Sequence, residues 1–402
     1  MVRIVLLNQY YVPSEAPTGL LLADLGQALV ASGHEVTAIC SDRDYANPES
    51  RYPRVEASDG VQVRRVSGTG FGRGRRIGRL VDYVSFMVGA LLRLATQRKP
   101  DVVVVLTTPP MFAFPSWLIA RLRSARLVFW VMDVYPDLAF ELGVLRRGSA
   151  VAAILRYISQ RVLKGADRVV ALGAFMAARL KQAGAAEVVT VHNWADGDAI
   201  RPRSVDGHPL REAWGWSNRF VVLYSGNLGL AHDFETALDA AELLRNRADV
   251  LLAFVGSGPQ AARVEAEARR RGLTNVEFRP WMALEQLGSS LTAGDVHLVT
   301  LRRDLAGLLV PSKIYGVLAA GRPAIYVGPP RSEVAEILNE GGCGVSISPG
   351  DARALADAVL DYADDPARRT EHGRRARVLF DRAYDRTRAV RRLIDVIESV
   401  AG

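Results

Sequence analysis

LLVPSKIYGVLAAGRPAIY, residues 308–326, predicts a short helix that ends at a Gly-Arg-Pro turn and leads directly into a buried strand. Pro311 and Ser312 favour the helix start, as an N1 proline and a hydroxyl cap, and Gly321 marks its end. Lys313 adds a positive charge where the first backbone N–H groups already attract anions. The stretch therefore predicts part of an α/β domain with a binding site for a nucleotide diphosphate. An ordinary helix with a solvated lysine fits the same spacing.

Outward from this stretch, the chain alternates strands and helices in two series. Apolar strands are predicted at residues 3–8, 35–40, 61–66, 101–106, 126–132, 168–172 and 187–191, and then at 221–224, 251–255, 276–279, 296–300 and 325–327. Continuous apolar runs such as VVVVL, residues 102–106, are typical of parallel strands that helices cover on both faces. The fold class is therefore α/β, with Rossmann-like doubly wound sheets.

The length of 402 residues is sufficient for two hydrophobic cores. Residues 193–218 break the alternation with Trp, Gly, Asp, Pro and Arg, as a linker would. We expect an N-terminal domain at 1–195 and a C-terminal domain at 196–384, facing each other across a cleft. Long helices are expected at 352–362 and 364–400, and the tail from about 385 to 402 is expected to pack back on the first domain.

A second glycine-rich motif supports the anion site. FVVLYSGNLGLAHDFETALDAAELL, residues 220–244, predicts a strand, a glycine turn and an amphipathic helix. Gly226 and Gly229 let the backbone approach a ligand, and a helix start supplies N–H donors. SGNLG is not the GxGxxG dinucleotide fingerprint, and such turns also occur without a ligand. Two turns with backbone N–H groups available to an anion in one domain, one of them with a lysine, favour a phosphate site.

The net charge of +8 and the pI near 9.7 favour anionic partners. Arg73, Arg75, Arg76 and Arg79 precede the apolar helix predicted at 80–99. This pattern indicates either contact with an anionic membrane surface or a core helix with a solvated basic loop. Nucleic acid is not expected, because basic and aromatic residues do not interleave. Without a spanning segment or a signal-peptide pattern, we expect a cytoplasmic protein, with a peripheral place on the inner face of the plasma membrane as an option.

Metal and disulfide chemistry are not expected. Cys40 and Cys343 are far apart in the sequence and are expected to be buried and inert. The pairs Asp42 with Asp44 and Asp196 with Asp198 have the D-x-D spacing of some metal-binding transferases, but both lie in turn-like stretches. The histidines do not form a metal-spaced cluster; among them, His232 lies near the glycine turn and either contacts a phosphate or is solvated.

Taken in order, NQYYVPSEAPTG, LTTPPMF, MDVYPD, VHNWAD, YSGNLG, FVGSGP and PSKIYGVLAAGRP resemble the GT-B glycosyltransferases of family 4, over essentially the whole chain. The likeness is strongest to the colanic-acid and O-antigen type that includes N-acetyl-fucosamine transferases. The resemblance implies a retaining transferase that moves a sugar, an N-acetylated hexosamine or deoxyhexosamine, from a UDP-sugar to a lipid-linked or saccharide acceptor. It implies no cofactor and no metal ion, because basic residues and helix dipoles replace the metal in this fold.

The resemblance also implies roles for individual residues. The donor-binding positions would be Gly19, Gly226, Asn227, Arg279, Trp281, Arg302, Ser312 and Lys313. Asn227 stands where arginine is frequent, so Lys313, Arg302 or Arg303 would carry more of the phosphate charge. Gly19, in the loop 13–19 of the first domain, would approach the sugar phosphate.

Two departures from the family pattern matter. Gly316 stands where a ribose-binding glutamate is expected, and Glu333 or Glu336 is a candidate substitute, although carboxylates in a first helical turn are also simply stabilised by the helix dipole. Met132 stands where many members have a histidine, so the expected catalytic carboxylate is Asp133, which would accept or orient the acceptor proton. The alternative for Asp133 is a structural carboxylate that caps the YPD turn.

Three other functions fit parts of the sequence. A nicotinamide dehydrogenase is disfavoured, because the first strand leads into NQYYVPSEAPTG rather than GxGxxG. A UDP-sugar 2-epimerase of the same fold would change a free nucleotide sugar without an acceptor. A catalytically silent sugar-nucleotide-binding partner would bind the donor without turnover. For the transferase, removal of Lys313 in Lys313→Ala is expected to lower turnover by roughly 100-fold or more.

Overall fold

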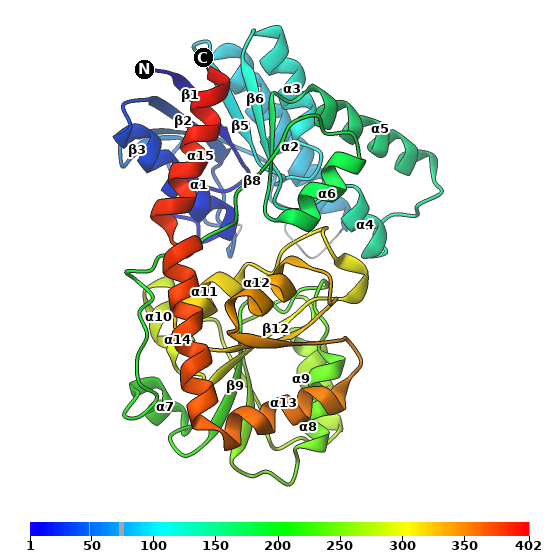
Figure 1. Cartoon of the computed structure of the whole chain (residues 1–402). Coiled ribbons are helices and arrows are strands. Elements are labelled where there is room, and N and C mark those ends of the chain that lie inside the picture. The colour runs from blue at the N-terminus through cyan, green and yellow to red at the C-terminus, as the bar shows by residue number, and fades with distance from the viewer. Residues whose placement is uncertain (48, 72–75, 402) are drawn as a thin grey trace. The chain divides into compact units, whose positions relative to one another are not determined.

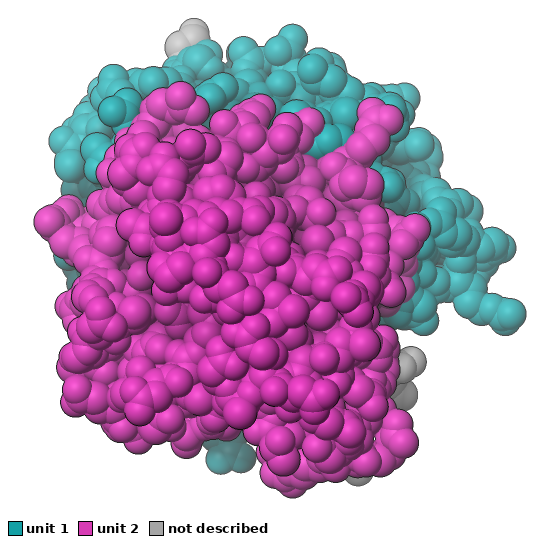
Figure 2. All heavy atoms as spheres, turned by 60° about the horizontal axis from the view of Figure 1, so that its bottom comes forward, with its two compact units in different colours: residues 1–192, 387–402 teal, residues 193–386 magenta. Residues whose placement is uncertain are grey.

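The computed structural model describes residues 1–47, 49–71 and 76–401, and in these ranges the chain forms two α/β units (Figure 1). The first unit comprises residues 1–192 with 387–402, and the second comprises residues 193–386 (Figure 2). Each unit has one sheet with helices on both faces. The predicted pair of doubly wound, mostly parallel sheets is thus confirmed.

The sheet of the first unit has, in its described residues, eight strands in the order β3-β4-β2-β1-β5-β6-β7-β8. Their bounds are β1 (Arg3–Leu7), β2 (Glu35–Ser41), β3 (Val55–Ser58), β4 (Val61–Val66), β5 (Val102–Val105), β6 (Arg126–Trp130), β7 (Arg168–Ala171) and β8 (Val188–Thr190). All pairs are parallel except β3 with β4. The central strand β5 is VVVV and is buried throughout, as its apolar run predicts.

The helices of the first unit are α1 (Pro17–Ala31), α2 (Arg76–Thr96), α3 (Ala113–Leu122), α4 (Asp137–Glu141), α5 (Ala150–Gly165), α6 (Ala174–Gln182) and most of α15 (Arg386–Ala401). α2 packs beside α3, and α3 packs beside α5, so these three helices form one layer. The neighbour of α1 is α15, because His34 Nε2, just after α1, lies 3.0 Å from Glu398 Oε1.

The second unit has a parallel sheet, within the described residues, in the order β11-β10-β9-β12-β13-β14. Its strands are β9 (Phe220–Ser225), β10 (Val250–Val255), β11 (Val276–Arg279), β12 (Val296–Thr300), β13 (Ala324–Val327) and β14 (Gly344–Ile347). Its helices are α7 (Pro209–Trp214), α8 (Glu235–Leu243), α9 (Ala261–Arg270), α10 (Leu287–Thr292), α11 (Lys313–Ala319), α12 (Glu333–Gly341), α13 (Ala352–Asp364) and α14 (Pro366–Ala383), with the 3₁₀ turns η1 (Leu284–Gln286) and η2 (Arg303–Leu305). A buried apolar cluster lies between the sheet and α8, α9 and α13.

The expected linker at 193–218 is an ordered part of the second unit, so that prediction is wrong. Arg211 of α7 is buried and donates to Asp295 Oδ2 at 2.8 Å and to the carbonyl of Ala293 at 3.1 Å. Trp216 is also buried, and its indole N–H donates to Glu277 Oε2 at 3.0 Å. These contacts join residues far apart in the sequence, and a composition typical of linkers gives no sign of them.

The single helix predicted at 364–400 is instead two helices, α14 and α15. Asp365 caps α14 by accepting from the N–H of Arg368 at 2.9 Å, and Pro366 follows at the first helical position. The break comes after Ala383, where Asp385 forms an isolated parallel bridge with Ala195 and the N–H of Arg386 donates to the carbonyl of Ala195 at 3.2 Å. Pairing with a segment that is distant in the sequence therefore interrupts the helix that the local pattern predicts.

Candidate functional site

The strongest candidate site of the second unit lies where its sheet changes direction. β9 has β10 on one side and β12 on the other, so the connections from β9 and from β12 leave toward opposite edges. Ligands of doubly wound sheets bind outside the carboxyl ends of strands at such a point. Gly226 and Asn227 follow β9 directly, and α11 with Lys313 follows β12, so the structure brings both predicted motifs to this point.

Lys313 is the distinctive group of this site. Its Nζ is buried, has no hydrogen-bond partner among the described residues, and lies 3.4 Å from the centroid of the Tyr224 ring. Burial lowers the pKa of Lys313 well below its usual value. A Cβ added at Gly226 would lie 3.4 Å from Cε and 3.6 Å from Nζ of Lys313. An ammonium without an acceptor in such surroundings costs free energy, which a bound anion would offset.

A further glycine segment, FVGSGP at residues 254–259, holds the glycine turn in place. The N–H of Leu228 donates to the carbonyl of Ser257 at 2.7 Å, and the N–H of Gln260 donates to the carbonyl of Leu228 at 3.0 Å. A Cβ at Gly256 would lie 2.1 Å from the carbonyl oxygen of Gly226, and at Gly258 it would lie 2.7 Å from the nitrogen of Leu228. Both glycines therefore allow two loops to cross at backbone distance, a role that their spacing does not reveal.

His232 is held by the backbone beside the glycine turn. Its Nδ1 lies 2.6 Å from the carbonyl oxygen of Thr300, so that nitrogen carries the proton and donates it. Burial, and secondly the charge of Lys313, lowers the pKa of His232 to about 3. The ring is therefore neutral near pH 7, and its Nε2 is an acceptor. The ring packs beside Tyr224 and Thr300 rather than in solvent, and a phosphate contact through Nε2 stays a prediction.

The other positively charged residues predicted to bind the nucleotide sugar form ion pairs or hydrogen bonds within the second unit. Arg302 pairs with Asp304 at 2.6 Å, and Arg303 donates to the carbonyl of Pro349 at 2.9 Å. Arg279, at the end of β11, pairs with Glu277 and donates to the carbonyl of Trp214 at 3.3 Å. Among the described basic groups discussed for this site, Lys313 is thus the one that the structure leaves without a partner.

The remaining residues predicted to bind the nucleotide sugar are at or near the surface. Asn227 is exposed, and its amide nitrogen lies 3.1 Å from where a Cβ of Gly229 would be. Trp281 is half-exposed in the loop after β11. Ser312 precedes α11, but its hydroxyl makes no capping bond in this described helix, so the prediction of a hydroxyl cap is wrong. The backbone of Ser312 is already near helical, which turns its side chain away from the N–H groups that a cap would reach.

The two substitute glutamates have different surroundings. Both lie in the first turn of α12, where Glu333 is buried and Glu336 is exposed. Burial first, and then the charges of Tyr384 and Glu333, raises the pKa of Tyr315 in α11, and burial and the charge of Glu333 raise that of Tyr326 in β13. Gly316 itself faces the apolar side chain of Leu291, whose Cδ1 would lie 3.0 Å from an added Cβ. An added side chain at Gly316 would therefore shift the end of the Leu291 side chain by a few tenths of an ångström, and a role of Glu333 or Glu336 toward the ribose stays a prediction.

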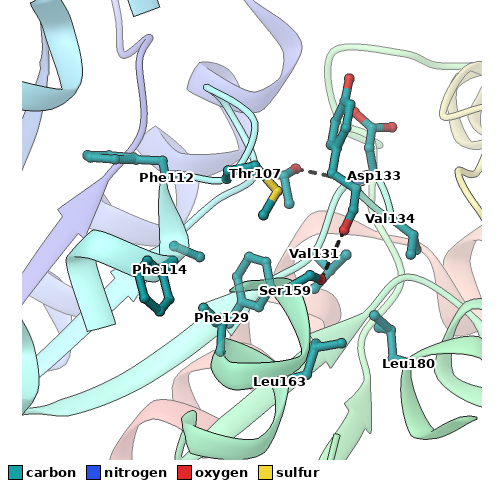
Figure 3. A pocket seen from close by; sticks show the side chains of 14 residues that line it. Thr107, Phe112, Phe114, Phe129, Val131, Asp133, Val134, Ser159, Leu163 and Leu180 are labelled. Atoms are coloured by element: carbon teal, nitrogen blue, oxygen red, sulfur yellow. Dashed lines mark hydrogen bonds between the residues drawn. The ribbon is translucent and has the colours of Figure 1, made fainter. Parts of the chain in front are cut away.

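Asp133 of the first unit follows β6 and lines a cavity of about 30 Å³ (Figure 3). The Oγ1 of Thr107, just after β5, accepts from the N–H groups of Met132 and Asp133, both at 3.3 Å. Most of the lining is apolar, including Phe112 and Leu180. Burial in these surroundings raises the pKa of Asp133 from 3.8 to about 6.

The alternative role of Asp133, as a structural carboxylate that caps the YPD turn, stays a hypothesis. Within the described chain, the helix that follows the YPD turn, α4, has no capping bond from a side chain. A carboxyl group with a pKa of about 6 changes its protonation state close to physiological pH. A catalytic role of Asp133 toward the proton of an acceptor hydroxyl stays a prediction.

Gly19 has a packing reason to be glycine. A Cβ at this position in the first turns of α1 would lie 3.1 Å from the carbonyl carbon and oxygen of Tyr10. Its N–H donates to the carbonyl of Ala16 at 2.8 Å. These contacts fold the loop 10–19 against its own helix, and a role of Gly19 toward a sugar phosphate stays a prediction.

Asp44 and Asp196 of the D-x-D pairs are turn residues, as predicted, whereas Asp42 is buried, accepts from Ser67 Oγ at 2.8 Å and pairs with Arg51 at 3.3 Å. Asp44 Oδ1 accepts from the N–H of Ala46 at 2.8 Å, and Asp196 Oδ1 accepts from the N–H of Asp198 at 2.9 Å. Such local bonds are those of Asx turns. Cys40 and Cys343 are both buried and unbridged, as expected.

Comparison with known proteins identifies the family. Residues 19–194 match the family model of the glycosyl transferase 4-like domain, and residues 219–365 match that of glycosyl transferases group 1. A Pseudomonas aeruginosa protein, provisionally named the glycosyltransferase WbjE, is 30% identical over 66% of this chain and 67% of its own length. A protein of Escherichia coli (strain K12), provisionally named the colanic acid biosynthesis glycosyl transferase WcaI, is 28% identical over 98% of this chain and 99% of its own length.

Solved structures share the architecture of the whole chain. HepE of Anabaena, solved in complex with UDP-glucose, superposes with a TM-score of 0.74 at 17% identity and covers 99% of this chain and 100% of its own. Sucrose-phosphate synthase from Thermosynechococcus elongatus gives a TM-score of 0.73 at 16% identity, over 100% of this chain and 99% of its own. The chain therefore has the GT-B fold and belongs to glycosyltransferase family 4.

Proposed function

We propose that this glycosyltransferase moves a sugar from a UDP-sugar to a lipid-linked or saccharide acceptor in bacterial polysaccharide or glycolipid biosynthesis, with retention at the sugar carbon. The observation that carries the proposal is the buried amino group of Lys313 beside Gly226, at the switch point of the second sheet, which has no hydrogen-bond partner in the described part of the chain. A diphosphate at this point would supply the missing acceptor. HepE was solved with UDP-glucose, and the name of WcaI refers to colanic acid, which supports the donor and pathway classes.

In the proposed reaction, the bond between the sugar carbon and the diphosphate oxygen breaks and UDP leaves. Lys313 stabilises the negative charge that develops on the diphosphate, and anion binding restores the charged form that burial disfavours. The acceptor oxygen bonds to the sugar carbon and loses its proton. That proton goes to Asp133 or to the leaving phosphate on the same face, in which case Asp133 only positions the hydroxyl.

The finer assignments rest on resemblance and on the described geometry. The sugar is an N-acetylated hexosamine or deoxyhexosamine, Glu333 replaces the ribose ligand of the family, and catalysis needs no metal ion. The basic residues 73, 75, 76 and 79 meet an anionic membrane surface, which places a cytoplasmic protein at the inner face of the plasma membrane. Residues 73 and 75 and the side chain of 76 lie outside the described residues, and Arg79 is exposed. No helix in the described ranges has the length and apolarity needed to cross a membrane.

Mass spectrometry of the products tests the proposal. The protein is incubated with a panel of UDP-sugars and a bacterial membrane lipid extract, beside the volume-preserving variant Lys313→Met. A mass gain of one sugar on a lipid or saccharide, with UDP release that falls by about 100-fold in the variant, supports the transferase and names the donor. NMR of the product's anomeric carbon tests retention.

Two other outcomes would contradict the proposal. Conversion of a UDP-sugar to its 2-epimer without an acceptor would identify a UDP-sugar 2-epimerase. Binding of UDP-sugar without turnover would identify a catalytically silent partner, a hypothesis that the glycine at position 316 favours, because it supplies no carboxylate where the family has one.

A further inference from the structure

Helix α2 is apolar on both of its faces. Phe86, Ala90 and Leu94 are buried against the first unit's core. On the opposite side, Leu80, Val84, Val88 and Leu92 follow at intervals of four residues, and each is between 51% and 62% exposed. A surface helix of a globular protein normally has polar residues on its outer side, and a helix that is apolar all round is normally covered. The outer side of α2 therefore lacks the cover that its composition requires.

The neighbouring helices extend this surface. α3 packs beside α2, and α5 packs beside α3, in the same layer (Figure 1). Their exposed side chains are also large and apolar: Leu118 and Leu122 on α3, and Val151, Ile154 and Tyr157 on α5. Leu122 is 84% exposed. Together, the nine residues 80, 84, 88, 92, 118, 122, 151, 154 and 157 form what we call the apolar face. Large exposed apolar side chains on three neighbouring helices of one layer indicate an interaction surface.

The charges on these helices are almost entirely positive. The described basic side chains are Arg79, Arg93, Arg121, Arg156, Arg161 and Lys164. Among the described residues of α2, α3 and α5, Asp82 is the one carboxylate, and it accepts from Thr69 Oγ1 at 2.8 Å and from the N–H of Phe71 at 3.0 Å. Its charge is thus taken up by the first unit itself. A partner of this face must accept apolar side chains and carry negative charge around them.

We infer that the apolar face of α2, α3 and α5 inserts into the interfacial layer of an anionic lipid bilayer, with the surrounding arginines at the level of the lipid headgroups. Leucine, valine and isoleucine side chains suit the boundary with the acyl chains, and arginine and tyrosine suit the headgroup region. The inference deepens the proposed function, on which it rests for its biological sense, since an acceptor carried by a lipid is found at such a surface. It extends the contact from the basic loop before α2 to apolar insertion by three helices.

A second copy of the chain is the main competing occupant. Two copies joined through this face would bring two sets of like positive charges together around the contact, which opposes association. An anionic bilayer satisfies the apolar side chains and the charges at once. Self-association is therefore treated as an outcome that would overturn the inference.

Sedimentation with lipid vesicles tests the inference on the full chain. The variant Leu92→Gln/Leu122→Gln/Ile154→Gln changes one exposed residue on each helix. The control Val55→Gln/Leu243→Gln/Val378→Gln changes three residues that are between 53% and 58% exposed elsewhere. With vesicles of phosphatidylglycerol and phosphatidylcholine, we expect the first variant to lower the partition coefficient at least about tenfold and the control to leave it unchanged. Binding of the wild type should also weaken as sodium chloride is raised.

Three results would overturn the inference: a wild type that stays in the supernatant, a face variant that sediments like the wild type, or a wild-type dimer in analytical ultracentrifugation that the face variant dissociates. Calorimetric titration with UDP separates these results from failure of the proposed function. Both variants should bind UDP as the wild type does, because their changes lie away from Lys313 and Gly226. A wild type that binds vesicles but not UDP would contradict the donor proposal and leave the membrane surface standing.

Discussion

At the scale of single residues, Lys313 is placed for ligand binding at a cost to the stability of the unliganded chain. Its buried Nζ has no described hydrogen-bond acceptor and lies over the Tyr224 ring. We expect Lys313→Met to abolish UDP binding in calorimetry, because methionine keeps the volume and removes the charge. The same variant should unfold in urea at an equal or higher midpoint than the wild type, because it removes a buried amino group that has no hydrogen-bond partner among the described residues. The exposed Lys181, changed to methionine, is the matched control; a fall in the midpoint for the Lys313 variant would show that the ammonium is stabilising.

Asp133 shows the same conflict between stability and activity. Its pKa in the folded chain is about 6, above the usual 3.8, so the folded state holds the proton more tightly than the unfolded chain. The resulting stability is fully present below pH 3.8 and is lost as the pH rises through 6. At pH 7 we expect Asp133→Asn to raise the free energy of unfolding by up to about 3 kcal/mol and to lower the rate of transfer. Urea unfolding at pH 4 and pH 7 checks this, since the gain should disappear at the lower pH.

The activity of the wild type should depend on the same group. If the carboxylate of Asp133 accepts the acceptor's proton, the turnover rate falls as the pH drops through about 6. An initial-rate profile from pH 5 to pH 8 measures it. A profile that is unchanged in Asp133→Asn would assign the proton to the leaving phosphate and leave Asp133 a positioning residue.

At the scale of elements, the crossing of the two glycine loops is the feature most sensitive to small changes. Gly258 has φ of +149°, and a Cβ there would lie 2.4 Å from Asn227 Oδ1 and 2.7 Å from the nitrogen of Leu228. We expect Gly258→Ala to displace the SGNLG turn, to lower the free energy of unfolding by about 1 to 3 kcal/mol and to weaken UDP binding at least about tenfold. Gly350 is the control: its φ is +92°, but nothing lies within 4 Å of its Cβ position. Gly350→Ala should lower the free energy of unfolding by about 1 kcal/mol and leave UDP binding unchanged. If both variants weaken UDP binding equally, the steric clash at Gly258 is not the cause.

The same elements show what the sequence could predict. The lysine helix, the strand before the glycine turn and the parallel sheets follow from local patterns of apolar residues, and the structure has them all. The predictions failed where long-range contacts decide. Arg211 is drawn into the core by Asp295, 84 positions away, and His232 is fixed by the carbonyl of Thr300. The role of FVGSGP also depends on a crossing with residues 226–228, which no pattern within either segment contains.

At the scale of the whole molecule, the donor proposal assigns nucleotide binding to one of the two units. We expect UDP alone to slow amide hydrogen exchange at residues 224–232, 254–260 and 313–319 of the second unit. Residues 105–112 and 131–137 of the first unit, around the Asp133 cavity, should exchange as before. Hydrogen exchange followed by mass spectrometry measures both sets in one experiment. Protection confined to the first unit would place the nucleotide elsewhere and contradict the role of Lys313.

The bridge between Ala195 and Asp385 has a consequence for how the chain is made. It joins the start and the end of the second unit, which is one continuous segment, whereas the first unit is completed only by residues 387–402. Seven side chains of α15, from Ala389 to Val400, are buried when that helix is in place. During synthesis on the ribosome, the second unit has all its residues before the first unit does. The domain made first must therefore wait with an uncovered apolar surface until the last helix has emerged.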